Sequence, residues 1–187
     1  MLVNDTNKRR KTVALLAVIC AVLQVGVAPH LAIANGHPNL ALVFAGLVAL
    51  QTGGTYGIVA GFCAGLFYDL VTTGPIGLMA GLLTALGYVV GLGERSRLTD
   101  DAAGSVRIFA AAAAAVELLY QLGLIIAGQG AGIADALLTR WLPSTLWDVI
   151  VFLPFCWVLS HRQAGTPQLG NRRKGKGQKG LSTKGLH

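Results

Sequence analysis

Residues 53–71 read GGTYGIVAGFCAGLFYDLV, an apolar stretch that contains a single charged side chain. Four of its glycines recur at a spacing of four residues, and an acid continues the series: Gly53, Gly57, Gly61, Gly65 and Asp69. Residues four apart lie along one ridge of an α-helix, and small residues on such a ridge let another backbone approach closely. The stretch therefore predicts an apolar helix that packs tightly against another helix.

The next apolar run, Ile76–Gly93, follows after the short turn Thr72–Pro75, so we expect the two runs to form antiparallel neighbours. It repeats small residues at the same spacing, at Gly77, Gly81 and Ala85, and then has Gly87 and Gly91. We expect the two ridges to pack against each other within the chain. Contact with the helix of a partner protein is the alternative use of the same glycines.

The whole chain is unusually poor in charge. Of its 187 residues 53% are hydrophobic and 12% charged, about half the charged fraction of an average soluble domain. A membrane-spanning helix needs about 20 apolar residues, so six spans consume most of the chain. The six runs are Thr12–Ala28, Pro38–Leu50, Gly53–Val71, Ile76–Gly93, Val106–Ala127 and Trp141–Ser160. They predict an all-α polytopic membrane protein, built as a six-helix transmembrane bundle.

The formal net charge of +7 is concentrated in three places. Basic residues cluster at Lys8–Lys11, around the loop Glu94–Asp101 and in the C-terminal tail, whereas Arg140 stands apart. Cytoplasmic loops of membrane proteins carry an excess of Lys and Arg, so we expect both termini in the cytoplasm. The expected organisation is a basic N-terminus (1–11), a membrane domain (12–160) and a disordered polybasic tail (161–187).

Two features at the chain ends have alternative interpretations. The polybasic tail is rich in Gly and lacks aromatic residues, so we expect contact with anionic lipids and no binding of nucleic acid. The N-terminal cluster, the first apolar run and Ala32–Ala34 could also form a cleaved signal peptide. Cleavage would leave five spans, and we favour an uncleaved first span because its apolar run is long for a signal peptide.

Three acids, Asp69, Glu117 and Asp148, lie inside the predicted spans, where a central Asp costs about 2.5–3.5 kcal/mol on insertion scales. Two polar faces accompany them: Glu117, Tyr120 and Gln121 share one helix face, and Ser144, Thr145 and Asp148 share another. We expect hydrogen bonds between these faces inside the bundle. A pocket or a partner contact is the alternative.

The sequence predicts no catalytic residues, metal site or cofactor. The spans contain no Ser/His/Asp set, no metal-ligand spacing and no phosphate-binding loop. Three scattered acids also make a poor proton relay. The cysteines, Cys20, Cys63 and Cys156, all fall inside apolar segments and are expected to be free thiols.

One region resembles a known family. Residues 57–70, GIVAGFCAGLFYDL, are followed by Gly74–Leu78 (GPIGL) and by Gly87-Tyr88, and together they resemble the rod shape-determining protein MreD family. The resemblance implies a non-catalytic scaffold of the cell-elongation machinery in the bacterial inner membrane, which serves peptidoglycan synthesis. It also implies an MreC-like single-span partner, and through it MreB-like filaments and peptidoglycan synthases. By position, the family motif corresponds to Gly57, Gly61, Gly65 and Asp69, with Asp69 expected as a polar anchor for a partner at the outer edge.

A second class of protein has a similar layout. The substrate-binding S components of energy-coupling-factor vitamin transporters are also small six-span proteins. They dock their partner through Ala-x-x-x-Ala contacts, and Ala17 and Ala21 have that spacing. The loop Pro29–Pro38 offers no aromatic residue for a vitamin site, however, so the scaffold is the favoured prediction.

Overall fold

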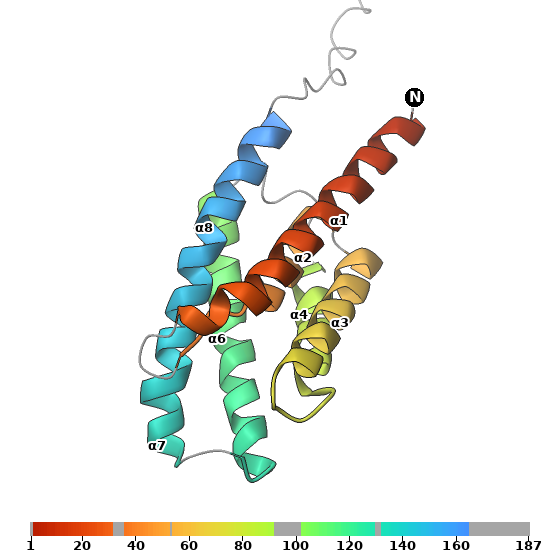
Figure 1. Ribbon diagram of the computed structural model, residues 1–187. Helices are drawn as coiled ribbons and strands as arrows, with labels where there is room; N and C mark the ends of the chain where they lie inside the picture. Colours follow the sequence, from red (N-terminus) through yellow and green to blue (C-terminus); the bar gives the residue numbers. More distant parts are fainter. Residues whose placement is uncertain (1, 32–35, 53, 92–101, 130–131, 165–187) are drawn as a thin grey trace, which may run out of the picture.

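Figure 1 shows the computed structural model of the chain, which describes residues 2–31, 36–52, 54–91, 102–129 and 132–164. Within these ranges the regular elements are helices and there is no β-strand, so the all-α prediction is confirmed. The elements are α1 (Leu2–Gly26), the 3-10 helix η1 (Ala28–His30), α2 (Leu40–Thr52), α3 (Gly54–Val71), α4 (Leu78–Gly91), α6 (Ala102–Ile126), α7 (Ile133–Asp135), the π-helical η2 (Ala136–Trp141) and α8 (Leu142–Ala164).

Each predicted apolar run corresponds to a helix, but the first and last helices extend beyond the predicted runs. Helix α1 begins at Leu2 and includes the basic cluster that was expected to precede it. Helix α8 continues to Ala164, beyond the predicted end at Ser160. Gly53, the loop Glu94–Asp101, residues Ala32–Ala34 and the tail from residue 165 lie outside the described residues.

Two stretches of the described chain, Ala103–Ile126 and Ala136–Leu159, are long and apolar enough to cross a membrane, by length and composition alone. Helices α2, with 13 residues, and α4, with 14, are about 20 Å long, less than the roughly 30 Å of a bilayer core. The six-span bundle therefore stays a prediction. In Figure 1 the start of α1 and the end of α8 lie at the same end of the molecule.

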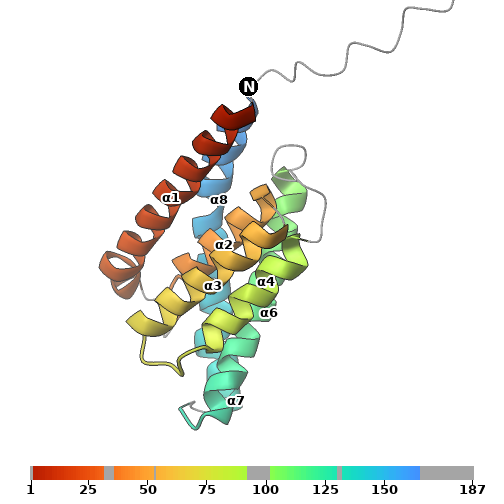
Figure 2. The same cartoon turned by 90° about the vertical axis from the view of Figure 1, so that its right-hand side faces the viewer.

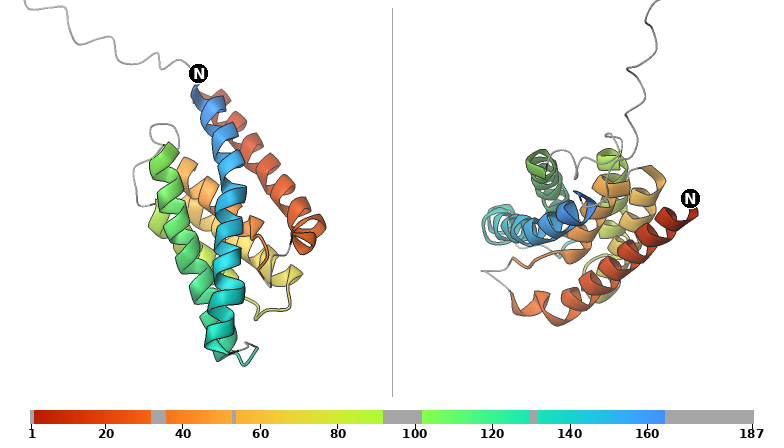
Figure 3. Two further views of the ribbon diagram at one scale, coloured as in Figure 1. Left: turned by 90° about the vertical axis from the view of Figure 1, so that its left-hand side faces the viewer. Right: turned by 90° about the horizontal axis from the view of Figure 1, so that it is seen from above.

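Helix α2 forms the centre of the fold. All 13 of its residues are buried, as expected for a helix that is apolar on every side. It contacts α1, α3, α4, α6 and α8, and Figure 3 shows it enclosed by its neighbours when the molecule is seen from above. A helix surrounded by its neighbours in this way can be shorter than a bilayer is thick.

Helices α6 and α8 pair along one side of α2. The rings of Phe109 and Phe152 stack with centroids 3.9 Å apart, and both side chains are buried. The ring of Phe109 also fills the space beside Gly46 of α2, where a Cβ atom would lie only 2.6 Å from it. Further along α6, the carbonyl of Ala114 accepts a 2.8 Å hydrogen bond from Nε1 of Trp141 in η2.

Candidate functional site: a buried polar cluster at two helix N-termini

The glycine ridge of α3 lies directly against α4, and the two helices form the antiparallel pair seen in Figure 2. A Cβ atom on Gly65 would lie 2.5 Å from the Cα atom of Ala80, and one on Gly57 would lie 3.1 Å from the carbonyl oxygen of Gly87. A Cβ atom on Gly61 would collide with the carbonyl oxygen of Leu83. The absence of side chains at these three positions lets the two backbones touch.

The face that α4 presents to this ridge differs from the predicted one. Ala80, Leu83 and Gly87 face α3, whereas Gly81 is exposed and a Cβ atom on it would meet nothing within 4 Å. Gly77 lies outside α4, in the turn before it, with φ of +98°. The expectation that Gly77, Gly81 and Ala85 pack against the ridge of α3 is therefore wrong, because α4 is rotated by about one residue relative to the predicted register. Gly87, the next small residue of the predicted series, does face α3.

Asp69 follows the ridge and caps the N-terminus of α4. Its Oδ2 accepts hydrogen bonds from the backbone N–H of Gly77 (2.8 Å) and Ala80 (3.1 Å), and its Oδ1 accepts one from Met79 (3.1 Å). A carboxylate at this position satisfies N–H groups that have no partner within the helix and lies at the positive end of the helix dipole.

The side chain of Asp69 is only 1% exposed. Its expected role as a polar anchor offered to a partner protein is therefore corrected. Both carboxylate oxygens are committed to the chain's own backbone, and a carboxylate buried in this way presents no surface to a second protein.

Asn39 makes the corresponding cap at the N-terminus of α2 and joins two acids to it. Its Oδ1 accepts from the backbone N–H of Leu42 (3.1 Å), as an N-cap side chain does. Its own backbone N–H donates to Oδ1 of Asp148 (2.7 Å), and its side-chain Nδ2 donates to Oε1 of Glu117 (3.1 Å). The same Nδ2 lies 3.8 Å from the Sδ atom of Met79, which links this cap to the start of α4.

A second side chain completes the cap of α2. Gln24 of α1 is buried, and its Oε1 accepts a 2.7 Å hydrogen bond from the backbone N–H of Leu40. The first turn of the central helix is therefore held by groups from α1, α6 and α8. The N-termini of α2 and α4, two positive dipole ends, lie close together among three carboxyl groups.

The two polar faces predicted on the last long helices meet through Asn39. Glu117 and Asp148 both contact this residue, so the cluster brings together α6, α8 and the start of α2. Tyr120 and Gln121 are buried beside Glu117, and Tyr120 packs edge-to-face on Tyr68 of α3 with centroids 5.9 Å apart. One atom, Oδ2 of Asp148, is buried without a hydrogen-bond partner.

The hydrogen bonds of this cluster hold helices together. Its acids accept hydrogen bonds from backbone and amide N–H groups. Among the described residues there is no group of three or more His, Cys, Asp or Glu side chains that could hold a metal ion. The three cysteines are free, with Cys20 and Cys156 buried and Cys63 exposed.

Two members of the cluster, Asn39 and Gln24, were not predicted as site residues. The signal for Asn39 is local: it stands between Pro38 and the apolar run from Leu40, a typical N-cap position. Gln24 carries no such signal, because its partner is a backbone group of the next helix in the bundle.

Comparison with known proteins decides the family. Residues 8–160 match the family model of the rod shape-determining protein MreD, which is most of the chain. The chain belongs to the MreD family. The resemblance inferred from the glycine motif is thus confirmed, and the match includes the glycine ridge of α3 and every residue of the polar cluster. No curated protein and no solved structure gives a match.

Membership of the MreD family has two direct consequences. The MreD family consists of membrane proteins involved in determining rod shape, and it is not a known enzyme family. The glycine motif from which the family was inferred also acquires a physical explanation in this chain. Gly57, Gly61 and Gly65 admit the backbone of α4, and Asp69 caps the same helix, so the motif joins two helices.

Proposed function

We propose that the chain is a non-catalytic integral-membrane scaffold of the cell-elongation machinery, which binds partner membrane proteins by helix–helix docking. Membership of the MreD family is the observation that carries this proposal. The polar cluster supports it, because its acids hold the chain's own helices together instead of converging on a substrate. The S-component alternative receives no support from the family match.

The partner surface that we propose is the outer face of α4. The ridge of α3 is covered by α4, so it has no room for a second helix. Gly81, Ala85 and Tyr88 are exposed on a different side of α4 from the residues that face α3. Small residues at a spacing of four let a transmembrane helix approach closely, and a single-span MreC-like protein would supply such a helix. MreB-like filaments and peptidoglycan synthases would be reached through that partner.

We further propose that the chain spans the inner membrane several times with both termini in the cytoplasm. The one-sided distribution of Lys and Arg supports this orientation, and so does the position of the start of α1 and the end of α8 at one end of the molecule. A tag at each terminus, tested for access to an impermeant protease in sealed spheroplasts, should be protected. Access to one tag alone would contradict the orientation.

Co-purification with the MreC-like partner tests the docking surface. Gly81→Leu adds a large side chain in open space, so the fold should persist while binding is lost. Ala115→Leu makes a comparable change at an exposed position of α6 and serves as the matched control. Binding by Gly81→Leu at the level of the control would show that the outer face of α4 is not the docking surface.

Complementation tests the cellular role. In a rod-shaped bacterium depleted of its own MreD, the wild-type chain and Ala115→Leu should restore rods, whereas Gly81→Leu should leave rounded cells. If the wild-type chain, present in the membrane together with its own MreC-like partner, fails to restore rods, the scaffold function is wrong. If Gly81→Leu also restores rods, the scaffold function still holds, and only the proposed docking surface on α4 is wrong.

A further inference from the structure

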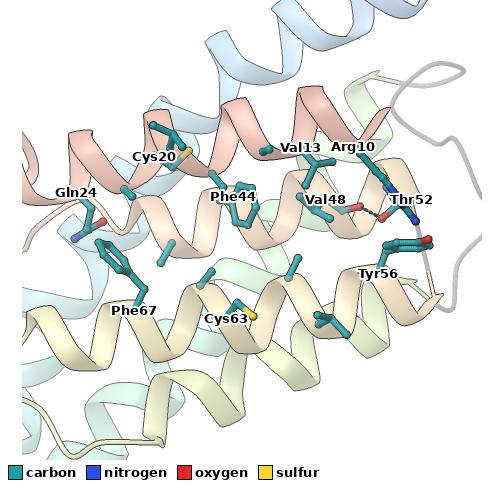
Figure 4. Close-up of a pocket in the computed structure, with 18 residues that line it drawn as sticks. Arg10, Val13, Cys20, Gln24, Phe44, Val48, Thr52, Tyr56, Cys63 and Phe67 are labelled. Atoms are coloured by element: carbon teal, nitrogen blue, oxygen red, sulfur yellow. Dashed lines mark hydrogen bonds between the residues drawn. The ribbon is translucent and has the colours of Figure 1, made fainter. Parts of the chain in front are cut away.

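A groove of about 960 Å³ runs between α1 and α3, with α2 as its floor. Its walls are almost entirely apolar: Ala17 and Cys20 come from α1, Phe44 from α2, and Cys63 and Phe67 from α3. Figure 4 shows these side chains around the space between the helices. The volume is at the upper end of the roughly 300–1,000 Å³ range of ligand sites in proteins. The groove is therefore large enough for a substantial apolar ligand.

One end of the groove is polar and basic. Arg10 of α1 extends toward Thr52 and Tyr56 at that end, as Figure 4 shows. Arg10 and Tyr56 are both exposed, and the hydroxyl of Thr52 donates to the carbonyl of Val48. No acidic side chain is among the described residues that line the groove. Among the described lining residues the charge at this end is therefore basic, and it is complementary to an anion.

The length of the groove distinguishes two kinds of apolar occupant. From Arg10 to Gln24, α1 rises about 21 Å, and from Tyr56 to Phe67 α3 rises about 16 Å. These lengths are about half to two-thirds of a bilayer core of about 30 Å, and they are too short to cover a transmembrane helix along its whole span. An acyl chain that starts at the membrane interface needs to pass through one leaflet only.

We infer that the groove binds one anionic phospholipid from the leaflet at the N-terminal end of α1. Its acyl chain lies between α1 and α3 over α2, and its phosphate lies beside Arg10 and Tyr56. The guanidinium of Arg10 and the phenol of Tyr56 supply hydrogen-bond donors, and Arg binds phosphate oxygens well because its N–H groups form a planar fork. This site is separate from the outer face of α4 and from the C-terminal tail.

Native mass spectrometry of the full chain tests this assignment. The protein is reconstituted with equal amounts of phosphatidylglycerol and phosphatidylcholine that carry the same acyl chains, and is then extracted in a mild detergent. We expect one retained phosphatidylglycerol per chain, in clear preference to phosphatidylcholine. Equal retention of the two lipids would overturn the assignment, since a groove that selects only for the acyl chain cannot distinguish them.

Two variants separate the headgroup from the acyl chain. Arg10→Gln should reduce the preference for phosphatidylglycerol about fivefold, the effect of one basic residue near a membrane surface. Arg107→Gln removes an equally exposed Arg from α6, outside the groove, and should leave the preference unchanged. Cys63→Phe should fill the groove and reduce retention of both lipids, whereas Ala111→Phe on α6 should not. Equal behaviour within either pair would contradict the assignment.

Photocrosslinking in cells distinguishes a lipid from a protein occupant. A photoreactive maleimide attached to Cys63, the exposed cysteine of the groove, should form adducts with phospholipid. Crosslinking chiefly to a membrane-spanning helix of a second protein would overturn the lipid assignment. It would make the groove a protein-docking surface instead.

Discussion

Replacement of Asp69 by Ala should destabilise the α3–α4 pair. The change removes three hydrogen bonds to the backbone of Gly77, Met79 and Ala80, and it leaves their N–H groups at a buried helix end. Hydrogen bonds inside membrane proteins contribute about 0.6 kcal/mol on average and up to about 1.7 kcal/mol each. Loss of all three should therefore cost about 2 to 5 kcal/mol, a large part of the roughly 5–15 kcal/mol that holds a protein folded.

Unfolding in detergent by titration with SDS, followed by circular dichroism, measures this loss. Asp69→Asn keeps one acceptor oxygen, so it should lose about half as much free energy of unfolding as Asp69→Ala. Thr84→Ala is the matched control on α4, because its hydroxyl donates to the carbonyl of Ala80 and its removal leaves no backbone N–H unpaired. If Asp69→Ala unfolds at the midpoint of Thr84→Ala, the cap does not stabilise α4 and the reasoning from these distances is wrong.

Three further changes test the packing and the polar cluster. Gly65→Ala should lower the free energy of unfolding by about 1–3 kcal/mol, because its methyl group overpacks against α4. Gly81→Ala should be neutral or stabilising in the same titration. Equal effects of the two substitutions would contradict the register of the two helices. Asn39→Ala removes the side-chain bond to Glu117 and the N-cap bond to Leu42, and it keeps the backbone bond to Asp148. Its unfolding midpoint should fall below that of the wild-type chain, and a wild-type midpoint would refute its central role. Cys63 alone should react with a maleimide in the folded detergent-solubilised protein, as peptide mapping by mass spectrometry would show; modification of the buried cysteines at the same rate would contradict the packing of α1 and α8.

The sequence was informative about the ridge of α3 because its glycines from Gly57 onward recur on a single ridge. Gly57, Gly61 and Gly65 are the small residues of that ridge, so the close face of the helix could be read directly. Helix α4 offers two small-residue faces, one through Gly81 and one through Ala80 and Gly87. The choice between them depends on where the turn ends, and the cap by Asp69 starts the helix at Leu78.

The polar cluster was predictable in its parts but not in its connections. Glu117 and Asp148 were recognisable as acids in apolar helices, and Asn39 carries a local N-cap signal. Asn39 is separated from Glu117 by 78 residues and from Asp148 by 109, however. Nothing in local periodicity specifies which helix ends meet across such distances, because that depends on how all the helices pack around α2.

The enclosure of α2 constrains how the chain can be made. Asn39 is synthesised 109 residues before Asp148. Gln24, which accepts from the backbone N–H of Leu40, is the only one of the described groups capping α2 from other helices that is synthesised before α2. During synthesis the start of α2 is therefore incomplete until the last helix is made, because the backbone N–H of Asn39 donates to Asp148 of α8. A nascent chain that stops before α8 leaves that turn incomplete in an apolar environment, where unpaired amides are costly. Release of the C-terminal helix from the insertion machinery is thus the step that completes the centre of the protein.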